Sequence, residues 1–140
     1  MRLLAFITMA GLLVTAAPGI PDAQQGATAV VNPTTGTEMT TYYMVLLRRG
    51  PAWTATVTPE SSAVSKGHME NINRLTAAGK MVVAGPFLDQ TGAQALTGLF
   101  ILRVASLDEA KETVATDPAV KAGRFTYEIM PWMGPKTLRF

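Results

Sequence analysis

The chain contains a single histidine, and its neighbours place it on the apolar face of a predicted helix. The members of that face are Val64, His68, Ile72 and Leu75, at spacings of 4, 4 and 3 residues. Side chains at these spacings lie on one side of an α-helix. We therefore expect the imidazole to point toward the surface on which the helix packs. An imidazole titrates near neutral pH, so there it is either a satisfied core group or a working acid/base.

Two aspartates are candidates for the group that orients this imidazole. Asp117 precedes Pro118, where it would also cap the next helical turn, and a cap uses one carboxylate oxygen and leaves the other available. Asp89 ranks lower, because it lies in a loop where a solvated carboxylate is the ordinary case. Gly85 and Pro86 precede that loop and are candidates for the floor of a cleft, since glycine lets a ligand approach the backbone closely. An ordinary strand end is the alternative for both.

The composition excludes several classes of site. The 140 residues include no cysteine, which excludes thiolate nucleophiles and disulfides, and one histidine makes a His-rich metal centre a poor fit. We expect neither a metal nor a cofactor. The net charge is +2 and the largest Lys/Arg cluster is Arg48-Arg49, too little for an electrostatic grip on nucleic acid. No nucleophile elbow or phosphate-binding loop is present, which disfavours acyl transfer and nucleotide binding.

The amino-terminal residues have the pattern of an export signal. Met1-Arg2 is followed by an apolar run to Val14 and then by small residues, a secretory signal peptide rather than a membrane span of about 20 residues. A retained anchor or a misassigned start is the alternative. We expect a signal peptide at 1–23, a flexible spacer at 24–40, a folded domain at 41–134 and a tail at 135–140. The mature protein would then be periplasmic or secreted, without stable membrane insertion.

Apolar runs and turn signals predict the elements of the domain. The first half contains a strand at 42–47, a helix capped by Thr58 and closed by Gly79, and a strand at 81–84. The second half contains a strand at 97–104, a helix that starts with a Ser106–Glu109 capping box and ends at Asp117-Pro118, and a short turn stopped by Gly123. The last strand is at 125–130, and residues 131–140 are irregular. This order predicts an α+β, ferredoxin-like βαββαβ fold with a four-stranded antiparallel sheet.

The predicted helices can cover only one of the two faces of the predicted sheet. Two helices cover one face, yet the strands at 42–47 and 97–104 are apolar on both sides, so the second face also needs a cover. A second copy of the chain is the simplest source. We therefore expect a homodimer packed sheet against sheet.

Taken together, these motifs resemble the YciI-like (YCII-related) family of the dimeric α/β-barrel superfamily. The resemblance covers about residues 42–133. It is carried by His68 in the first helix, Leu75-x-x-x-Gly79-Lys80-Met81 leading into Ala84-Gly85-Pro86, Thr97-Gly98, Ser106-x-x-Glu109-Ala110, Asp117-Pro118, Gly123 and Ile129-Met130-Pro131-Trp132. The chain departs from the compact family pattern by its export signal, its spacer and a longer loop around Trp53.

The resemblance implies a dimeric α/β barrel with a cleft beside a His-Asp acid/base pair, here His68 and Asp117. The wider superfamily includes cofactor-independent isomerases, lyases and oxygenases. Our first hypothesis is therefore an exported enzyme that transfers a proton on a small organic substrate, as in isomerisation or elimination. The alternative is a non-catalytic dimeric module that binds a small ligand or a partner, with His68 as a hydrogen-bond donor.

Overall fold

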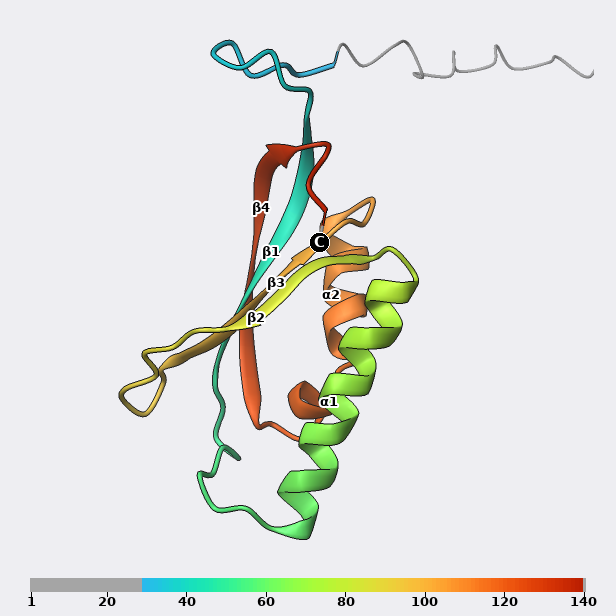
Figure 1. Cartoon of the computed structure of the whole chain (residues 1–140). Helices are drawn as coiled ribbons and strands as arrows, with labels where there is room; N and C mark the ends of the chain where they lie inside the picture. Colours follow the sequence, from blue (N-terminus) through green and yellow to red (C-terminus); the bar gives the residue numbers. More distant parts are fainter. Residues whose placement is uncertain (1–28, 140) are drawn as a thin grey trace, which may run out of the picture.

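The computed structural model describes residues 29–139, in which four strands form one antiparallel sheet accompanied by three helices. The strand order is β2-β3-β1-β4 (Figure 1), the order of a ferredoxin-like sheet, so the predicted fold class is confirmed. The elements are β1 (Met39–Arg49), α1 (Pro59–Ala77), β2 (Met81–Pro86), β3 (Leu96–Leu102), α2 (Leu107–Ala115), α3 (Pro118–Lys121) and β4 (Phe125–Pro135).

Strands β1 and β4 are longer than predicted. Strand β1 starts at Met39 rather than Tyr42, and β4 continues to Pro135 where we expected an irregular tail from Pro131. Met39 lies opposite Pro135 in a ladder that also includes Trp132. The sequence did not predict the extension of β4, because Pro131 and Pro135 are atypical of a strand interior. Because β4 is an edge strand, a missing N–H on its free side breaks no ladder hydrogen bond.

The segment before β1 contains local structure. Val31 and Glu38 form a β-bridge around a turn in which the Asn32 side chain accepts a hydrogen bond from Thr34 N–H at 2.9 Å. The expected signal peptide and residues 24–28 of the expected spacer lie outside the described residues. No helix within residues 29–139 is long and apolar enough to cross a membrane.

Helix α1 has the predicted start. Thr58 is its N-cap and Pro59 its first residue, and the Thr58 hydroxyl accepts the Ser61 N–H while the Ser61 hydroxyl accepts the Thr58 N–H. This reciprocal pair is a capping box. It satisfies two backbone donors that a helix start otherwise leaves unpaired.

The capping box predicted for α2 forms only in part. Ser106 caps the helix by accepting the Glu109 N–H, but Glu109 does not return the bond to Ser106. Its carboxylate instead accepts the Ala105 N–H and the Lys80 ammonium, each at 2.9 Å. These two donors lower the pKa of Glu109 below 4.5, the Ala105 N–H contributing more. Glu109 thereby links the start of α2 to the residue before β2.

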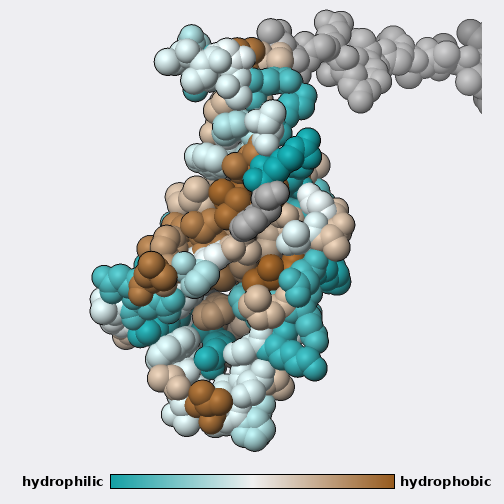
Figure 2. All heavy atoms as spheres, in the orientation of Figure 1, coloured by the Kyte–Doolittle hydropathy of each residue, from teal (hydrophilic) through white to brown (hydrophobic). Residues whose placement is uncertain are grey.

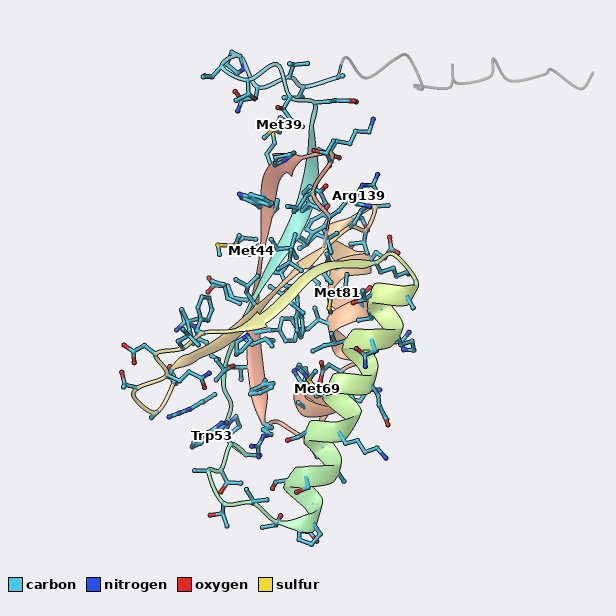
Figure 3. The ribbon with its side chains drawn as sticks, viewed as in Figure 1. Met39, Met44, Trp53, Met69, Met81 and Arg139 are labelled. Carbon is cyan, nitrogen blue, oxygen red and sulfur yellow. The ribbon has the colours of Figure 1, made fainter. Side chains whose placement is uncertain are left out.

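The main core lies between the sheet and the helices, which occupy one side of it (Figure 1). Its buried members come from β1, β2, β3, α1 and α2: Tyr43, Val45, Leu47, Leu75, Met81, Phe100, Leu102, Ala110 and Val114. A smaller cluster on the opposite face joins Tyr42, Val82 and Ile101, with Trp132 and Leu138 packed against it. Figure 3 shows Met81 on the helix side and Met44 pointing to the other. The candidate site lies on the helix side.

Candidate functional site

Helix α1 presents His68 toward the sheet. On the same face, Leu75 is buried and Ile72 packs against the core, as the sequence spacing predicts. The His68 ring contacts two aromatic rings, with centroid distances of 5.8 Å to Phe100 of β3 and 5.4 Å to Phe125 of β4. Its side chain is 17% exposed. The imidazole is thus held against an apolar wall with one part still accessible.

Asp117 approaches the imidazole from the start of α3. It is the N-cap of that helix, and its Oδ1 accepts the Ala119 N–H at 2.8 Å. Its Oδ2 lies 2.8 Å from Nδ1 of His68. The carboxylate has no exposed surface, so it must be compensated by hydrogen bonds. The cap and the histidine contact coexist, each on its own oxygen.

Gly67 lets α1 approach α3 closely enough for this contact. A Cβ atom at Gly67 would lie 3.0 Å from Cγ and 3.3 Å from Cβ of Pro118, tighter than ordinary van der Waals contact. Gly67 precedes His68 in α1, and Pro118 follows Asp117 in the segment that starts α3. The Gly67–Pro118 contact therefore lies next to the His68–Asp117 hydrogen bond. Glycine destabilises a helix by about 1 kcal/mol relative to alanine. At this position it allows α1 and α3 to come into contact, because it has no Cβ atom.

The hydrogen bonds fix which nitrogen of His68 is free. An ionised carboxylate only accepts, so with Oδ1 taking the Ala119 N–H and Oδ2 facing Nδ1, the ring donates from Nδ1. Among the hydrogen bonds of residues 29–139 none involves Nε2. In the neutral ring Nε2 therefore carries the lone pair. This is the arrangement of a general base oriented by a carboxylate.

The free edge of His68 borders a cavity of about 540 Å³. This volume is in the range of small-molecule sites. The wall is mainly apolar, and its side chains come from α1, all four strands and the two loops that flank the sheet end: Leu47, Trp53, Thr54, Ala55, His68, Met69, Ile72, Ala84, Gly85, Pro86, Gln90, Thr97, Gly98, Phe100, Arg124 and Phe125. Within residues 29–139, no carboxylate borders this cavity directly. Asp117 acts on the cavity only through the imidazole.

The comparisons with known proteins support one family. The model of the YCII-related domain matches residues 41–133. The chain belongs to the YCII-related family. The uncharacterized protein YjpA of Bacillus subtilis (strain 168) is 36% identical to it over 66 residues, which are 47% of this chain and 72% of YjpA.

A solved structure resembles this YCII-related protein at lower similarity. It is the 5-chloro-2-hydroxyhydroquinone dehydrochlorinase (TftG) of Burkholderia phenoliruptrix AC1100, in complex with 2,5-dihydroxybenzoquinone. The sequences are 24% identical, the TM-score is 0.49, and the match covers 65% of this chain and 92% of the other.

The structure places three of the five residues selected from the sequence on the cavity wall of the YCII-related protein, and a fourth, Asp117, in contact with His68. His68 borders the cavity with Asp117 behind, and Gly85 and Pro86 form part of its wall. Asp89 is exposed in the β2–β3 loop. Asp89 does not line the cavity, whereas the next residue, Gln90, does. Within residues 29–139, no three His, Asp or Glu side chains form a group suited to a metal ion.

The two tryptophans lie on opposite sides of the sheet. Trp53, in the segment between β1 and α1 (Figure 3), lines the cavity, whereas Trp132 packs on Tyr42 with ring centroids 5.9 Å apart. Arg49 holds Trp53 in place, because its guanidinium carbon lies 3.8 Å from the ring centroid. The same guanidinium donates to the carbonyl oxygens of Gln90 and Gly92 at 2.8 and 2.9 Å. Arg49 thus couples the two loops that flank the cavity.

Sequence analysis did not select two polar residues of the cavity wall, Gln90 and Arg124. Gln90 donates to the carbonyl oxygens of Phe87 and Thr97, and Arg124 lies between the turn at Gly123 and the start of β4. Gly50 approaches this turn closely: its N–H donates to Arg124 O at 2.9 Å, and a Cβ there would overlap the backbone of Gly123. A basic residue between Gly123 and an aromatic strand was the only signal for this position.

Proposed function

We propose that this protein is a cofactor-independent acid/base enzyme that moves a proton on a small organic substrate. His68 is the base, and Asp117 orients it. The observation that carries the proposal is the 2.8 Å Nδ1–Oδ2 contact at the wall of an apolar cavity. Membership of the YCII-related family is consistent with this chemistry without specifying a reaction.

The proposed step begins with a C–H bond next to a carbonyl. Nε2 of His68 takes the proton, the C–H electron pair moves toward the carbonyl, and an enolate forms. The imidazolium is stabilised by the Asp117 carboxylate, which is fully buried and therefore poorly screened. Return of the proton to another carbon completes an isomerisation, and loss of a leaving group from the enolate completes an elimination. No redox partner is needed for either outcome.

Solvent deuterium exchange tests this proposal without knowledge of the natural substrate. Small cyclic and aryl ketones are incubated with the protein in D₂O, and deuterium incorporation next to the carbonyl is followed by NMR. We expect exchange above the buffer rate for at least one member of the panel. If no ketone exchanges faster than in buffer, the proposal of enzymatic proton transfer fails.

A binding module is the second candidate, because the cavity is open to solvent and mainly apolar. In that case Nδ1 of His68 still donates to Asp117, so Nε2 of the neutral ring accepts a hydrogen bond from the ligand rather than donating one, as the sequence-based hypothesis had it. The same ketone panel separates the two functions. A ligand that perturbs the His68 resonances but exchanges no deuterium favours binding without catalysis.

We also propose that two copies pack through the sheet face that carries no helix. Met44 of β1 lies opposite Ile101 of β3 and Met130 of β4, and Leu46 lies opposite Leu99, so apolar side chains continue across three strands. Figure 2 shows hydrophobic side chains along the strands and mainly hydrophilic ones on the outer side of α1. An apolar surface of this kind supports a partner contact.

Met130→Glu tests the proposed dimer. Met130 is 39% exposed on β4, and a glutamate there would place an unpaired charge in the interface. We expect dimer affinity to fall by at least about 100-fold, which is about 2.7 kcal/mol, as measured by sedimentation or light scattering. Met133→Glu is the matched control: Met133 is 49% exposed on the same strand but faces the other side. Equal effects of the two variants, or a monomeric wild type, would contradict the proposed interface.

Export of the protein remains a proposal that rests on residues 1–23. We propose cleavage after Ala23, which makes Gln24 the first residue of a periplasmic or secreted form. Expression of the full chain in a Gram-negative host, followed by mass spectrometry of the periplasmic fraction, should find a mature chain beginning at Gln24. A protein found only in the cytoplasm with Met1 retained would exclude export.

A further inference from the structure

Arg124 is a cationic residue at the wall of the cavity, and its side chain has no partner among the described residues. It is half-buried at the start of β4, and its main chain is fixed on both sides: Arg124 N–H donates to Ala119 O and Gly50 N–H donates to Arg124 O, each at 2.9 Å. Within residues 29–139 its guanidinium donates no hydrogen bond and forms no ion pair. No Asp or Glu of the described chain lines the cavity that Arg124 borders.

Most of the other described arginines behave differently. Side-chain hydrogen bonds to the protein are donated by Arg48, Arg49, Arg74 and Arg103, whereas Arg139 donates none but is exposed to solvent. A guanidinium carries five N–H donors and stays ionised at all ordinary pH values. A half-buried guanidinium whose N–H groups make no hydrogen bond to the protein is available to bind a ligand. The guanidinium of Arg124 meets this condition, and a ligand bound to it would share the cavity with His68.

Glu60 is an alternative partner for Arg124, but its surroundings argue against this pairing. Arg124 also borders a smaller cavity of about 210 Å³ on whose wall Glu60 lies. Glu60, however, is exposed, and its own backbone N–H and the Thr58 hydroxyl lower its pKa from the ordinary value of 4.5. No hydrogen bond or ion pair joins Glu60 to Arg124 within the described chain. A carboxylate in contact with water needs no partner from the protein.

We propose that the substrate of this site is a small ring-bearing carboxylate whose anionic group binds Arg124. The inference rests on the proposed function for calling this anion a substrate. A carboxylate pairs with the two parallel N–H groups of an arginine side chain. The ring of the substrate then lies against Ile72, Phe100 and Phe125, at the free edge of His68. Arg124 fixes the orientation in which a ring C–H meets Nε2.

A matched pair of probes tests this inference by binding alone. Benzoate and benzamide have nearly the same shape, but only benzoate is an anion. We expect benzoate to bind wild-type protein at least about tenfold more tightly than benzamide, because charge-assisted hydrogen bonds are stronger than neutral ones. Isothermal titration calorimetry at low salt measures both affinities. In wild type, benzoate should also shift the Arg124 Nε–H resonance, a signal that needs no variant.

In Arg124→Gln, the affinities for benzoate and benzamide should differ by no more than about twofold. Arg124→Lys should retain part of the preference for benzoate, because lysine keeps the charge but lacks the planar guanidinium. Lys66→Gln is the control: it removes one positive charge from an exposed position of α1, so the benzoate-to-benzamide affinity ratio should stay at its wild-type value. Thermal unfolding checks that each variant is folded.

The outcomes separate this inference from the proposed function. A wild-type ratio near one, an unshifted Arg124 resonance, or a ratio unchanged in a folded Arg124→Gln variant would each overturn the role of Arg124. His68→Gln should keep the preference for benzoate while it loses deuterium exchange. If no ketone exchanges yet the Arg124-dependent preference is present, the acid/base proposal fails and the anion site stands.

Discussion

His68→Gln is expected to lower deuterium exchange on any ketone that the wild type turns over by about 10²- to 10⁴-fold, the usual contribution of a positioned general base. Glutamine has no group that accepts a proton near neutral pH. Its amide N–H can still donate to Oδ2 of Asp117, which now accepts from Nδ1 at 2.8 Å, so the buried carboxylate keeps two partners. The fold should therefore persist, and the loss should appear in turnover rather than in the thermal unfolding temperature.

Lys66→Gln is the control for this substitution, since it introduces the same residue into the same helix at an exposed site. It should exchange deuterium at the wild-type rate. A folded His68→Gln variant that retains more than about a tenth of the wild-type rate would show that another group takes the proton, because the effect would then be smaller than general-base catalysis normally provides.

Asp117→Asn is the second substitution with a large expected effect. The amide oxygen can keep the Ala119 N–H, and asparagine is as good an N-cap as aspartate. The amide nitrogen, however, donates to Nδ1 of His68 and forces the ring proton onto Nε2. The histidine then faces the cavity with an N–H rather than a lone pair. We expect exchange to fall by about 10²- to 10⁴-fold and unfolding free energy to change by no more than about 2 kcal/mol.

Asp108→Asn is the matched control, because Asp108 is an exposed aspartate in the first turn of α2 that pairs with Lys111 at 3.0 Å. It should leave exchange unchanged. Histidine NMR gives a second readout: in Asp117→Asn the ring proton should move from Nδ1 to Nε2. Normal exchange in this variant, with the proton still on Nδ1, would mean that Asp117 only caps α3.

Most of the fold followed from local signals. The Thr58-Pro59 start of α1, the Asp117-Pro118 start of α3 and the apolar runs of the inner strands each reflect a physical rule that acts over a few residues. The errors occurred where distant residues decide the structure. The ladder of Met39 with Pro135 and the reach of Glu109 to Lys80 depend on partners far away in sequence.

The candidate site was predictable to the same degree. His68 and Asp117 stand out because helix periodicity and cap chemistry act on them locally, and both lie where those rules put them. The packing partner of Gly67 and the position of Arg124 could not be predicted in this way. Gly67 matters because Pro118 packs on it, and Arg124 because the turn after α3 delivers it to a cavity built by other elements. Asp89 was selected for its residue type, but its loop directs it to solvent.

The most direct test of this account is the protonation pattern of the single histidine. Long-range ¹H–¹⁵N NMR of uniformly labelled protein gives one imidazole spin system, so no assignment is needed. At about pH 9, well above the ordinary imidazole pKa of about 6.5, we predict a protonated Nδ1 with a hydrogen-bonded proton and an unprotonated Nε2. A protonated Nε2 with a bare Nδ1 would contradict the donation of Nδ1–H to Asp117, and with it the claim that His68 offers a base to the cavity.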